Sequence, residues 1–173
     1  MAVIAAGLPF LFAVLVTLVA CSASTGALEA FERGDYAAAY AIWLPLARDG
    51  DPVAQNYLGV MHQLGLGVGR DPARAASWYL RAARAGNHDA QRNIGTLLYR
   101  GLGVAQDKVR AYGWYQYAAR GGNRSADAFM LAMTDEVTPN QMAQARALIR
   151  RELQNAAADA DMDTQGGGPR AEP

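Results

Sequence analysis

A 36-residue period dominates the sequence. The stretch from Ala54 to Asp89 is matched, at the same spacing, by the stretch from Ala90 to Ser125. The two copies share glycines, a Gly-Leu-Gly-Val run, an aspartate, a Trp-Tyr pair and several alanines. Self-similarity at a fixed period of roughly 20–50 residues is typical of a solenoid, in which stacked units build one continuous core. The period therefore predicts an all-α chain made of helix–turn–helix repeats.

Each unit contains the start and stop signals of two helices. Aspartate is the expected N-cap of the second helix, and glycine is expected to end it in the left-handed conformation. The first helix of the next unit follows at once, with its own Asp or Asn cap. The second-helix caps are Asp35, Asp71 and Asp107, the terminating glycines are Gly50, Gly86 and Gly122, and the first-helix caps are Asp51, Asn87 and Asn123.

Two sets of internal glycines need their own explanation. Gly59 and Gly95 lie inside the first helix, where glycine costs about 1 kcal/mol relative to alanine, so we expect a neighbouring helix to approach closely there. The Gly-Leu-Gly-Val runs at 65–68 and 101–104 are predicted to be turns with glycine at positive φ. These runs lack the full G-x-G-x-x-G pattern and lie between helices, which argues against a dinucleotide loop.

The repeats define the expected domain organisation. The solenoid is predicted over 27–155, with units at about 27–53, 54–89 and 90–125 and a partial unit at 126–155. A degenerate copy therefore comes first, and Thr138-Pro139 is the expected start of a final helix that ends near Asn155. Residues 156–173 are mostly Ala, Asp, Gly and Pro without apolar periodicity, so we expect a disordered tail.

The N-terminal segment predicts export. Residues 2–20 carry no charge and include a single polar side chain, Thr17; we interpret residues 1–21 as a signal peptide. The run Leu18-Val19-Ala20-Cys21 resembles the bacterial lipoprotein box, which implies lipidation of Cys21 and an exported, periplasmic, membrane-anchored protein. Two alternatives remain: ordinary secretion, with cleavage after Ala23 or Ala27, and an uncleaved membrane anchor.

The composition excludes several classes of function. The formal net charge is zero and there is no basic block, so nothing indicates nucleic-acid binding. His62 and His88 occupy different positions of the period, with His62 in a core slot and His88 expected to be exposed, and the carboxylates do not cluster in the array. We therefore expect no metal, no cofactor and no catalytic residues. The repeated Trp78/Trp114 and Tyr79/Tyr115 pairs favour core packing over a carbohydrate cage.

The repeated residues resemble the Sel1-like repeat, a relative of the tetratricopeptide repeat. The motifs are Ala54-x-x-x-Leu58-Gly59-x-Met61, Gly65-x-Gly67-Val68-x-x-Asp71, Ala75-x-x-Trp78-Tyr79-x-x-Ala82-Ala83 and Gly86. The resemblance covers roughly Ala27 to Met133. The chain departs from the family pattern where His62 and Leu98 replace Tyr and where Leu131 replaces Gly. The resemblance implies a right-handed α-solenoid that serves as a protein-interaction scaffold.

By analogy with tetratricopeptide geometry, the first helix of each unit lines a concave groove. The predicted partner-binding residues are the non-core positions Asn56, Gln63, Arg92, Thr96, Tyr99 and Arg100, with Val60 between them; the alternative is that they are ordinary solvated residues. The sequence thus indicates a non-enzymatic scaffold of the bacterial cell envelope that binds a protein or peptide. Two alternatives remain: an envelope hydrolase or regulator of cell-wall remodelling, and a membrane-tethered structural spacer.

Overall fold

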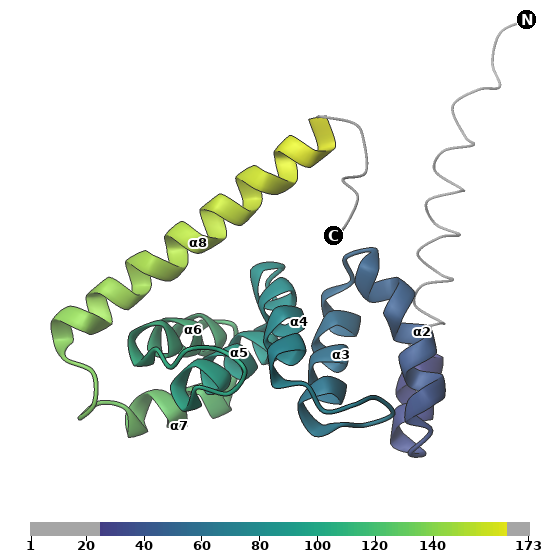
Figure 1. Cartoon of the computed structure of the whole chain (residues 1–173). Helices are drawn as coiled ribbons and strands as arrows, with labels where there is room; N and C mark the ends of the chain where they lie inside the picture. Colours follow the sequence, from purple (N-terminus) through teal and green to yellow (C-terminus); the bar gives the residue numbers. More distant parts are fainter. Residues whose placement is uncertain (1–24, 166–173) are drawn as a thin grey trace, which may run out of the picture. The chain divides into compact units, whose positions relative to one another are not determined.

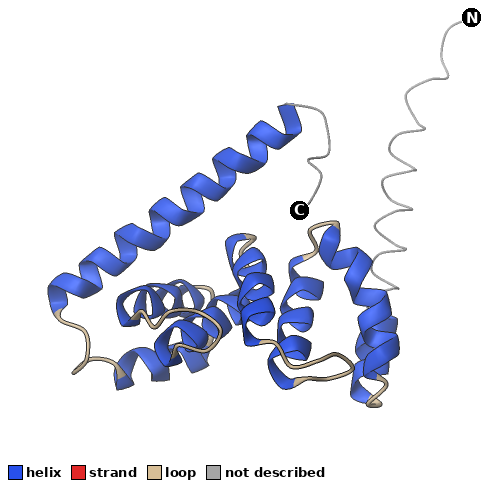
Figure 2. Ribbon diagram, in the orientation of Figure 1, coloured by secondary structure: helices blue, strands red, loops and turns tan. Residues whose placement is uncertain are grey.

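The structure, a computed structural model, describes residues 25–165. These residues form helices joined by turns and loops, and no strand occurs among them (Figure 1, Figure 2). Two compact units follow each other along the chain: unit 1 ends at Trp78 and unit 2 begins at Tyr79. The all-α prediction is confirmed. The predicted signal peptide and Cys21 lie outside the described residues.

The helices recur at the predicted period. Second helices of 13 residues begin at positions 36, 72 and 108, and first helices begin at 52, 88 and 124. They are α2 (Tyr36–Arg48), α3 (Pro52–Leu64), α4 (Pro72–Arg84), α5 (His88–Arg100), α6 (Lys108–Arg120) and the shorter α7 (Arg124–Ala132). Residues 25–32 are also helical, as expected for the shortened first helix of the degenerate copy.

The caps form as predicted. Asn87 accepts a hydrogen bond from the amide of Ala90 at 2.8 Å, and Asp107 accepts one from Arg110 at 2.9 Å. The terminating glycines all have positive φ, with values of 96°, 89° and 90° at positions 50, 86 and 122. In the linking turn, Gly67 also has positive φ, and a Cβ there would lie 2.8 Å from the Cβ of Tyr36. Only glycine satisfies both conditions at that position.

The core of unit 1 is built on Trp43. Its side chain is fully buried, and its ring stacks on Tyr57 at a centroid distance of 4.2 Å and an interplanar angle of 8°. Phe31, from the first helical segment, lies 5.5 Å from the Trp43 ring and 5.6 Å from the Tyr57 ring. Small alanines, with Leu58 and Met61, fill the remaining space. The degenerate copy therefore contributes Phe31 and Trp43 to an aromatic core that it shares with Tyr57 of α3.

His62 is buried in unit 1, as predicted, with 4% of its surface exposed. Its ring and that of Tyr40 form a T-shaped pair with centroids 6.0 Å apart, and the His62 backbone carbonyl accepts a hydrogen bond from the amide of Asp71 at 2.8 Å. Burial lowers the pKa of His62 below its ordinary value of 6.5, and the positive charge of Arg74 acts in the same direction. A hydrogen bond with the backbone of Gly69 and the charge of Asp71 oppose this more weakly. The folded state therefore favours the neutral imidazole.

This lowered pKa predicts a pH dependence of stability. Below pH 6.5 the unfolded chain binds a proton at His62 that the folded chain resists, so the free energy of unfolding should fall as pH drops below 6.5. In the His62→Gln variant this part of the pH dependence should disappear. Urea unfolding between pH 7.5 and 5 measures both profiles. Parallel profiles for the two proteins would show that His62 does not titrate in this way.

In unit 2, α6 packs against α5, α7 and α8 (Pro139–Gln165). At Gly95 of α5, a Cβ would lie 2.9 Å from Cε1 of Tyr115, so the predicted close approach of a neighbouring helix is confirmed there. At Gly113 of α6, a Cβ would lie 2.6 Å from Cγ1 of Ile149 and 2.8 Å from the carbonyl oxygen of Ala145. Glycine thus sets both helix separations.

Helix α7 begins in register but ends early. It has 9 residues, and Leu131, at the position of Gly95 in the preceding copy, is 73% exposed. A leucine at that position does not permit the close helix approach that Gly95 permits, and α8 instead packs on α6. The last copy is therefore not a complete helix pair.

The structure corrects the predicted tail. Helix α8 continues to Gln165, so residues 156–165 are helical and the disordered tail predicted from Ala156 is wrong over this range. Residues 156–165 contain several alanines and neither glycine nor proline, and extending an existing helix avoids the cost of nucleation. Helix formation here needs no apolar periodicity. Residues 166–173 lie outside the described residues. Among residues 25–165, none of the helices combines the length and apolar character required to span a membrane.

Glu152 links α8 to two other helices of unit 2. Its two carboxylate oxygens lie 2.9 Å from Nη2 of Arg84 on α4 and 2.9 Å from Nη2 of Arg110 on α6. The Glu152 side chain is 14% exposed. A partly buried carboxylate shared by two guanidinium groups contributes more than a typical surface ion pair, so this contact helps to hold the middle of α8 in place.

Candidate partner-binding face

Four of the six predicted partner-binding residues lie on one face of α5. Arg92, Thr96, Tyr99 and Arg100 occupy positions i, i+4, i+7 and i+8 of the helix, which places them in one line along its surface. Arg100 is exposed and the other three are half-buried. We call these four residues the α5 stripe. It spans about 12 Å along the helix axis, at 1.5 Å per residue.

The Thr96 hydroxyl already makes two hydrogen bonds within the chain. It accepts a hydrogen bond from the Tyr115 hydroxyl at 3.1 Å and donates one to the carbonyl of Arg92 at 3.0 Å. Tyr115 itself is fully buried and stacks on Phe129 of α7 at 5.1 Å. Thr96 therefore fixes the buried tyrosine beneath the α5 stripe.

The Thr96–Tyr115 bond gives a direct prediction. Replacing Thr96 with valine should lower the stability of unit 2 by about 1–2 kcal/mol, because the buried Tyr115 hydroxyl loses its acceptor. Replacing both Thr96→Val and Tyr115→Phe should cost less than the sum of the single changes. A double-mutant cycle from urea unfolding measures the coupling. Strict additivity would mean that the hydrogen bond contributes nothing.

Arg92 lies beside two buried tyrosines. Its positive charge lowers the pKa of both Tyr79 and Tyr115, while burial, the larger effect, raises the pKa of each above 10. Among the described residues, neither Arg92 nor Arg100 forms an ion pair with a carboxylate. The α5 stripe thus carries two guanidinium groups without an acidic partner in this part of the chain.

Tyr99 does have an acidic partner. Its hydroxyl donates a hydrogen bond to Oε1 of Glu136 at 2.7 Å, and Nζ of Lys108 lies 2.6 Å from Oε2 of the same carboxylate. The hydrogen bonds from Lys108 and Tyr99 lower the pKa of Glu136 below its usual value. Bonding to Glu136 raises the pKa of Tyr99 and of Lys108. We call these three residues the Glu136 clasp.

The other two predicted residues belong to unit 1. Asn56 and Gln63 lie on α3 and are half-buried, as is Val60 between them. In both units a side chain of the linking turn donates a hydrogen bond to a backbone carbonyl of the first helix. Arg70 donates to Gln63 at 3.1 Å, and Gln106 donates to Tyr99 at 2.8 Å. The two α3 residues therefore belong to unit 1, and the α5 stripe belongs to unit 2.

Sequence reasoning missed Lys108 and Glu136, and it treated Tyr115 only as core. In the preceding copy, 36 residues earlier, the position of Lys108 is occupied by Pro72 and that of Tyr115 by Tyr79. A departure from the repeat was therefore a usable signal for Lys108. No signal marked Glu136, because it lies beyond the complete repeats, in the turn that follows α7.

The structure describes the positions of His88 and of the repeated aromatic residues. His88 is exposed, with Nδ1 3.1 Å from Oε1 of Gln91. Trp114, Tyr79 and Tyr115 are at most 1% exposed, which confirms their place in the core. Trp78 is only half-buried and packs against the core cluster of unit 1 from outside it, so the core prediction is wrong for this residue. No group of three or more His, Cys, Asp or Glu side chains suited to hold a metal ion occurs among the described residues.

Comparisons with known proteins agree with this architecture. A family model described as the Sel1 repeat matches residues 52–87 and 88–123. These repeats begin two residues before the units predicted at 54 and 90, because the helices start at Pro52 and His88. No curated protein matched the chain in sequence.

Two solved structures are similar to this chain. A Sel1 repeat protein from Oxalobacter formigenes has 31% identity and a TM-score of 0.62, over 65% of this chain and 46% of its own. A protective antigen of uropathogenic Escherichia coli strains, which displays an SLR fold, has 25% identity and a TM-score of 0.72, over 89% of this chain and 34% of its own. The chain thus spans less than half the length of each. The family model thus places two consecutive Sel1 repeats at residues 52–123, and the chain is similar over most of its length to solved proteins with this repeat fold.

Proposed function

We propose that the chain is a non-enzymatic protein-interaction module and that the α5 stripe contacts the partner. The observation that carries the proposal is the pair of guanidinium groups, Arg92 and Arg100, on one helix face without an acidic partner among the described residues. Arginine and tyrosine often dominate the energy of protein interfaces, and arginine binds carboxylates through paired hydrogen bonds. The expected partner is therefore a protein or peptide that presents carboxylates.

The family supports the general class of function. Sel1 repeats generally mediate protein–protein interactions, and scaffolds built from them are typically non-catalytic. In repeat arrays the shared residues build the core, and the residues that differ between copies are free to specify a ligand. Arg92, Tyr99 and Arg100 differ from Asn56, Gln63 and Leu64 at the matching positions of the preceding copy.

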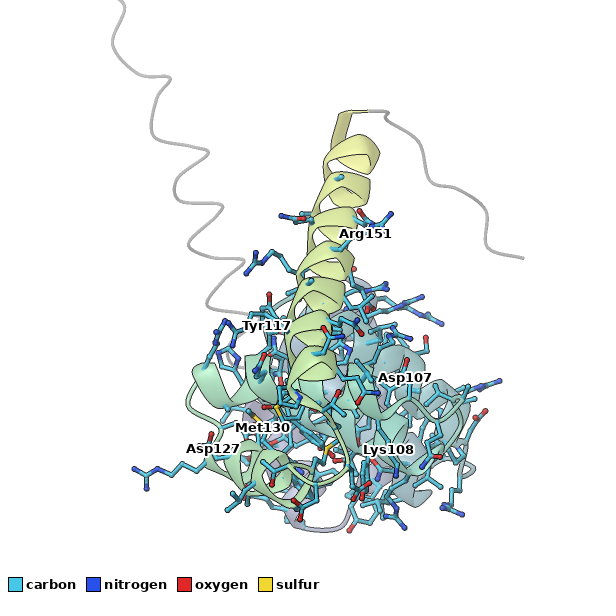
Figure 3. The ribbon with its side chains drawn as sticks, turned by 90° about the vertical axis from the view of Figure 1, so that its left-hand side faces the viewer. Asp107, Lys108, Tyr117, Asp127, Met130 and Arg151 are labelled. Atoms are coloured by element: carbon cyan, nitrogen blue, oxygen red, sulfur yellow. The ribbon has the colours of Figure 1, made fainter. Side chains whose placement is uncertain are left out.

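The partner-binding role is tested by charge reversal. In Arg92→Glu/Arg100→Glu, capture of a partner from an envelope extract should fall by at least about tenfold, because each arginine–carboxylate contact becomes repulsive. Arg150→Glu/Arg151→Glu is the matched control: both residues are exposed on α8 of the same unit, and Figure 3 shows Arg151 on the upper part of that helix. Unchanged capture by the Arg92→Glu/Arg100→Glu protein would exclude the α5 stripe as the binding face. If neither the wild type nor any variant captured a partner, the alternative of a membrane-tethered structural spacer would be favoured.

We further propose that the module acts in the bacterial cell envelope, anchored by lipid at Cys21. The support is the uncharged run at residues 2–20 followed by the single cysteine of the chain. Acyl chains on Cys21 would each contribute about 0.8 kcal/mol per buried methylene. Replacing Cys21 with alanine should move the protein from the membrane fraction to the soluble periplasmic fraction. Equal fractionation of the two proteins would exclude lipidation.

A further inference from the structure

The Glu136 clasp is a carboxylate-binding arrangement that the chain fills itself. One carboxylate oxygen accepts the Tyr99 hydroxyl at 2.7 Å and the other lies 2.6 Å from the Lys108 ammonium, which is also 5.8 Å from the centre of the Tyr99 ring. Each oxygen therefore has its own donor. Tyr99 belongs both to the clasp and to the α5 stripe, so the two arrangements share a residue.

The clasp is not part of the repeated packing. The positions of Tyr99 and Lys108 hold Gln63 and Pro72 in the preceding copy, so the hydroxyl and ammonium donors are not repeated there. Lys108 is also the single lysine of the chain. The clasp therefore belongs to the residues that distinguish this repeat from the one before it.

The turn that carries Glu136 has other anchors. The neighbouring side chains of Met133 and Val137 are each 2% exposed, and the amide of Val137 donates to the carbonyl of Met133 at 3.1 Å. Two apolar side chains thus anchor the turn on both sides of Glu136. The carboxylate is free to leave its donors without unfolding the segment that carries it.

The ion pair is also exposed enough to be displaced. The side chains of Lys108 and Glu136 are 43% and 31% exposed, and ion pairs at such positions are weak because water and salt screen them. A peptide with one carboxylate bound to Tyr99 and Lys108 and another at Arg92 or Arg100 would gain contacts that Glu136 does not make. Competition between the two carboxylates then favours the incoming one.

We propose that Tyr99 and Lys108 form the acidic-residue subsite of the α5 stripe, and that Glu136 occupies this subsite until an acidic peptide segment of the partner displaces it. The inference rests on the proposed function, because it concerns the same helix face. It adds the chemistry of the ligand and a self-inhibiting contact within the chain. An extended peptide covers the stripe of about 12 Å in about four residues, so a short acidic peptide suffices as a probe.

The test uses the whole chain and a fluorescein-labelled hexaglutamate peptide, with hexaglutamine as the uncharged comparison. Glu136→Gln should bind hexaglutamate about 3- to 10-fold more tightly than the wild type in fluorescence polarisation, as expected for removing a weak competing ion pair. Asp127→Asn is the matched control, because it removes one negative charge from an exposed position of the same unit. In Figure 3, Asp127 and Lys108 lie on opposite sides of the lower part of that unit. The control should change the affinity by less than about twofold.

The gain must also depend on the donors. In Glu136→Gln/Lys108→Gln the increase in affinity should disappear, and hexaglutamine should bind no variant. Equal affinities for wild type, Glu136→Gln and Asp127→Asn would overturn the proposal, as would the absence of hexaglutamate binding to every variant. Binding of phosphatidylglycerol vesicles in place of hexaglutamate would overturn the assignment to an acidic peptide. None of these results affects capture of the natural partner through Arg92 and Arg100, so the proposed function is tested separately.

Discussion

Replacing Trp43 with alanine should lower the free energy of unfolding of unit 1 by about 4 kcal/mol, the largest effect we expect from a single change. The side chain is fully buried, stacks on Tyr57 and contacts Phe31. Domains of this size have only about 5–15 kcal/mol of stability in total, so unit 1 should be partly unfolded at 37 °C. Urea unfolding followed by circular dichroism and by tryptophan fluorescence measures the loss.

Trp43→Phe is the matched control. It retains an aromatic ring for Tyr57 and Phe31 and removes the indole N–H, which has no hydrogen-bond partner among the described residues. We expect it to cost less than half as much as the alanine change. A Trp43→Ala protein as stable as the wild type would contradict the aromatic core assigned to the degenerate copy.

Replacing Gly113 with alanine should destabilise unit 2 by about 2 kcal/mol, although alanine is the better helix former by about 1 kcal/mol. A Cβ at this position would lie 2.8 Å from the backbone carbonyl oxygen of Ala145 and 2.6 Å from Cγ1 of Ile149. The backbone contact cannot be relieved by a rotamer change, so α8 must move away from α6. That movement would also strain the ion pairs of Glu152 with Arg84 and Arg110.

The control for this prediction is Gly26→Ala. Gly26 lies in the helical segment 25–32, and a Cβ added there would meet nothing within 4 Å, so alanine should leave stability unchanged or raise it by up to about 1 kcal/mol. Thermal unfolding of both variants separates the two effects. A Gly113→Ala protein that is more stable than the wild type would show that helix propensity outweighs the contact with α8.

The sequence predicted most of the repeat architecture because its signals are local. Caps such as Asn87 and terminating glycines such as Gly86 act within one turn of the helix, and they place helix ends within a few residues. The prediction failed for residues 156–165, where the lack of apolar periodicity suggested disorder. Periodicity reports burial on one face, whereas an alanine-rich helix that continues from a packed segment needs no buried face.

The candidate site could be predicted only in part. Spacing along one helix places Arg92, Tyr99 and Arg100 on a common face, but it does not show which of their polar groups already have partners. Glu136 lies 37 residues from Tyr99 and Tyr115 lies 19 residues from Thr96. Such contacts depend on how helices from different repeats pack, and the period alone contains no information about them. We therefore place the two arginines at the centre of the proposed site.

Site-specific photo-crosslinking in cells shows whether a protein partner contacts the α5 stripe. A benzoylphenylalanine in place of Tyr99 keeps an aromatic ring on the stripe. The same residue in place of Leu148, which is 47% exposed on α8, is the control. We expect a discrete crosslinked partner from position 99 and none from position 148. A partner crosslinked from position 148 with none from position 99 would contradict the proposed contact.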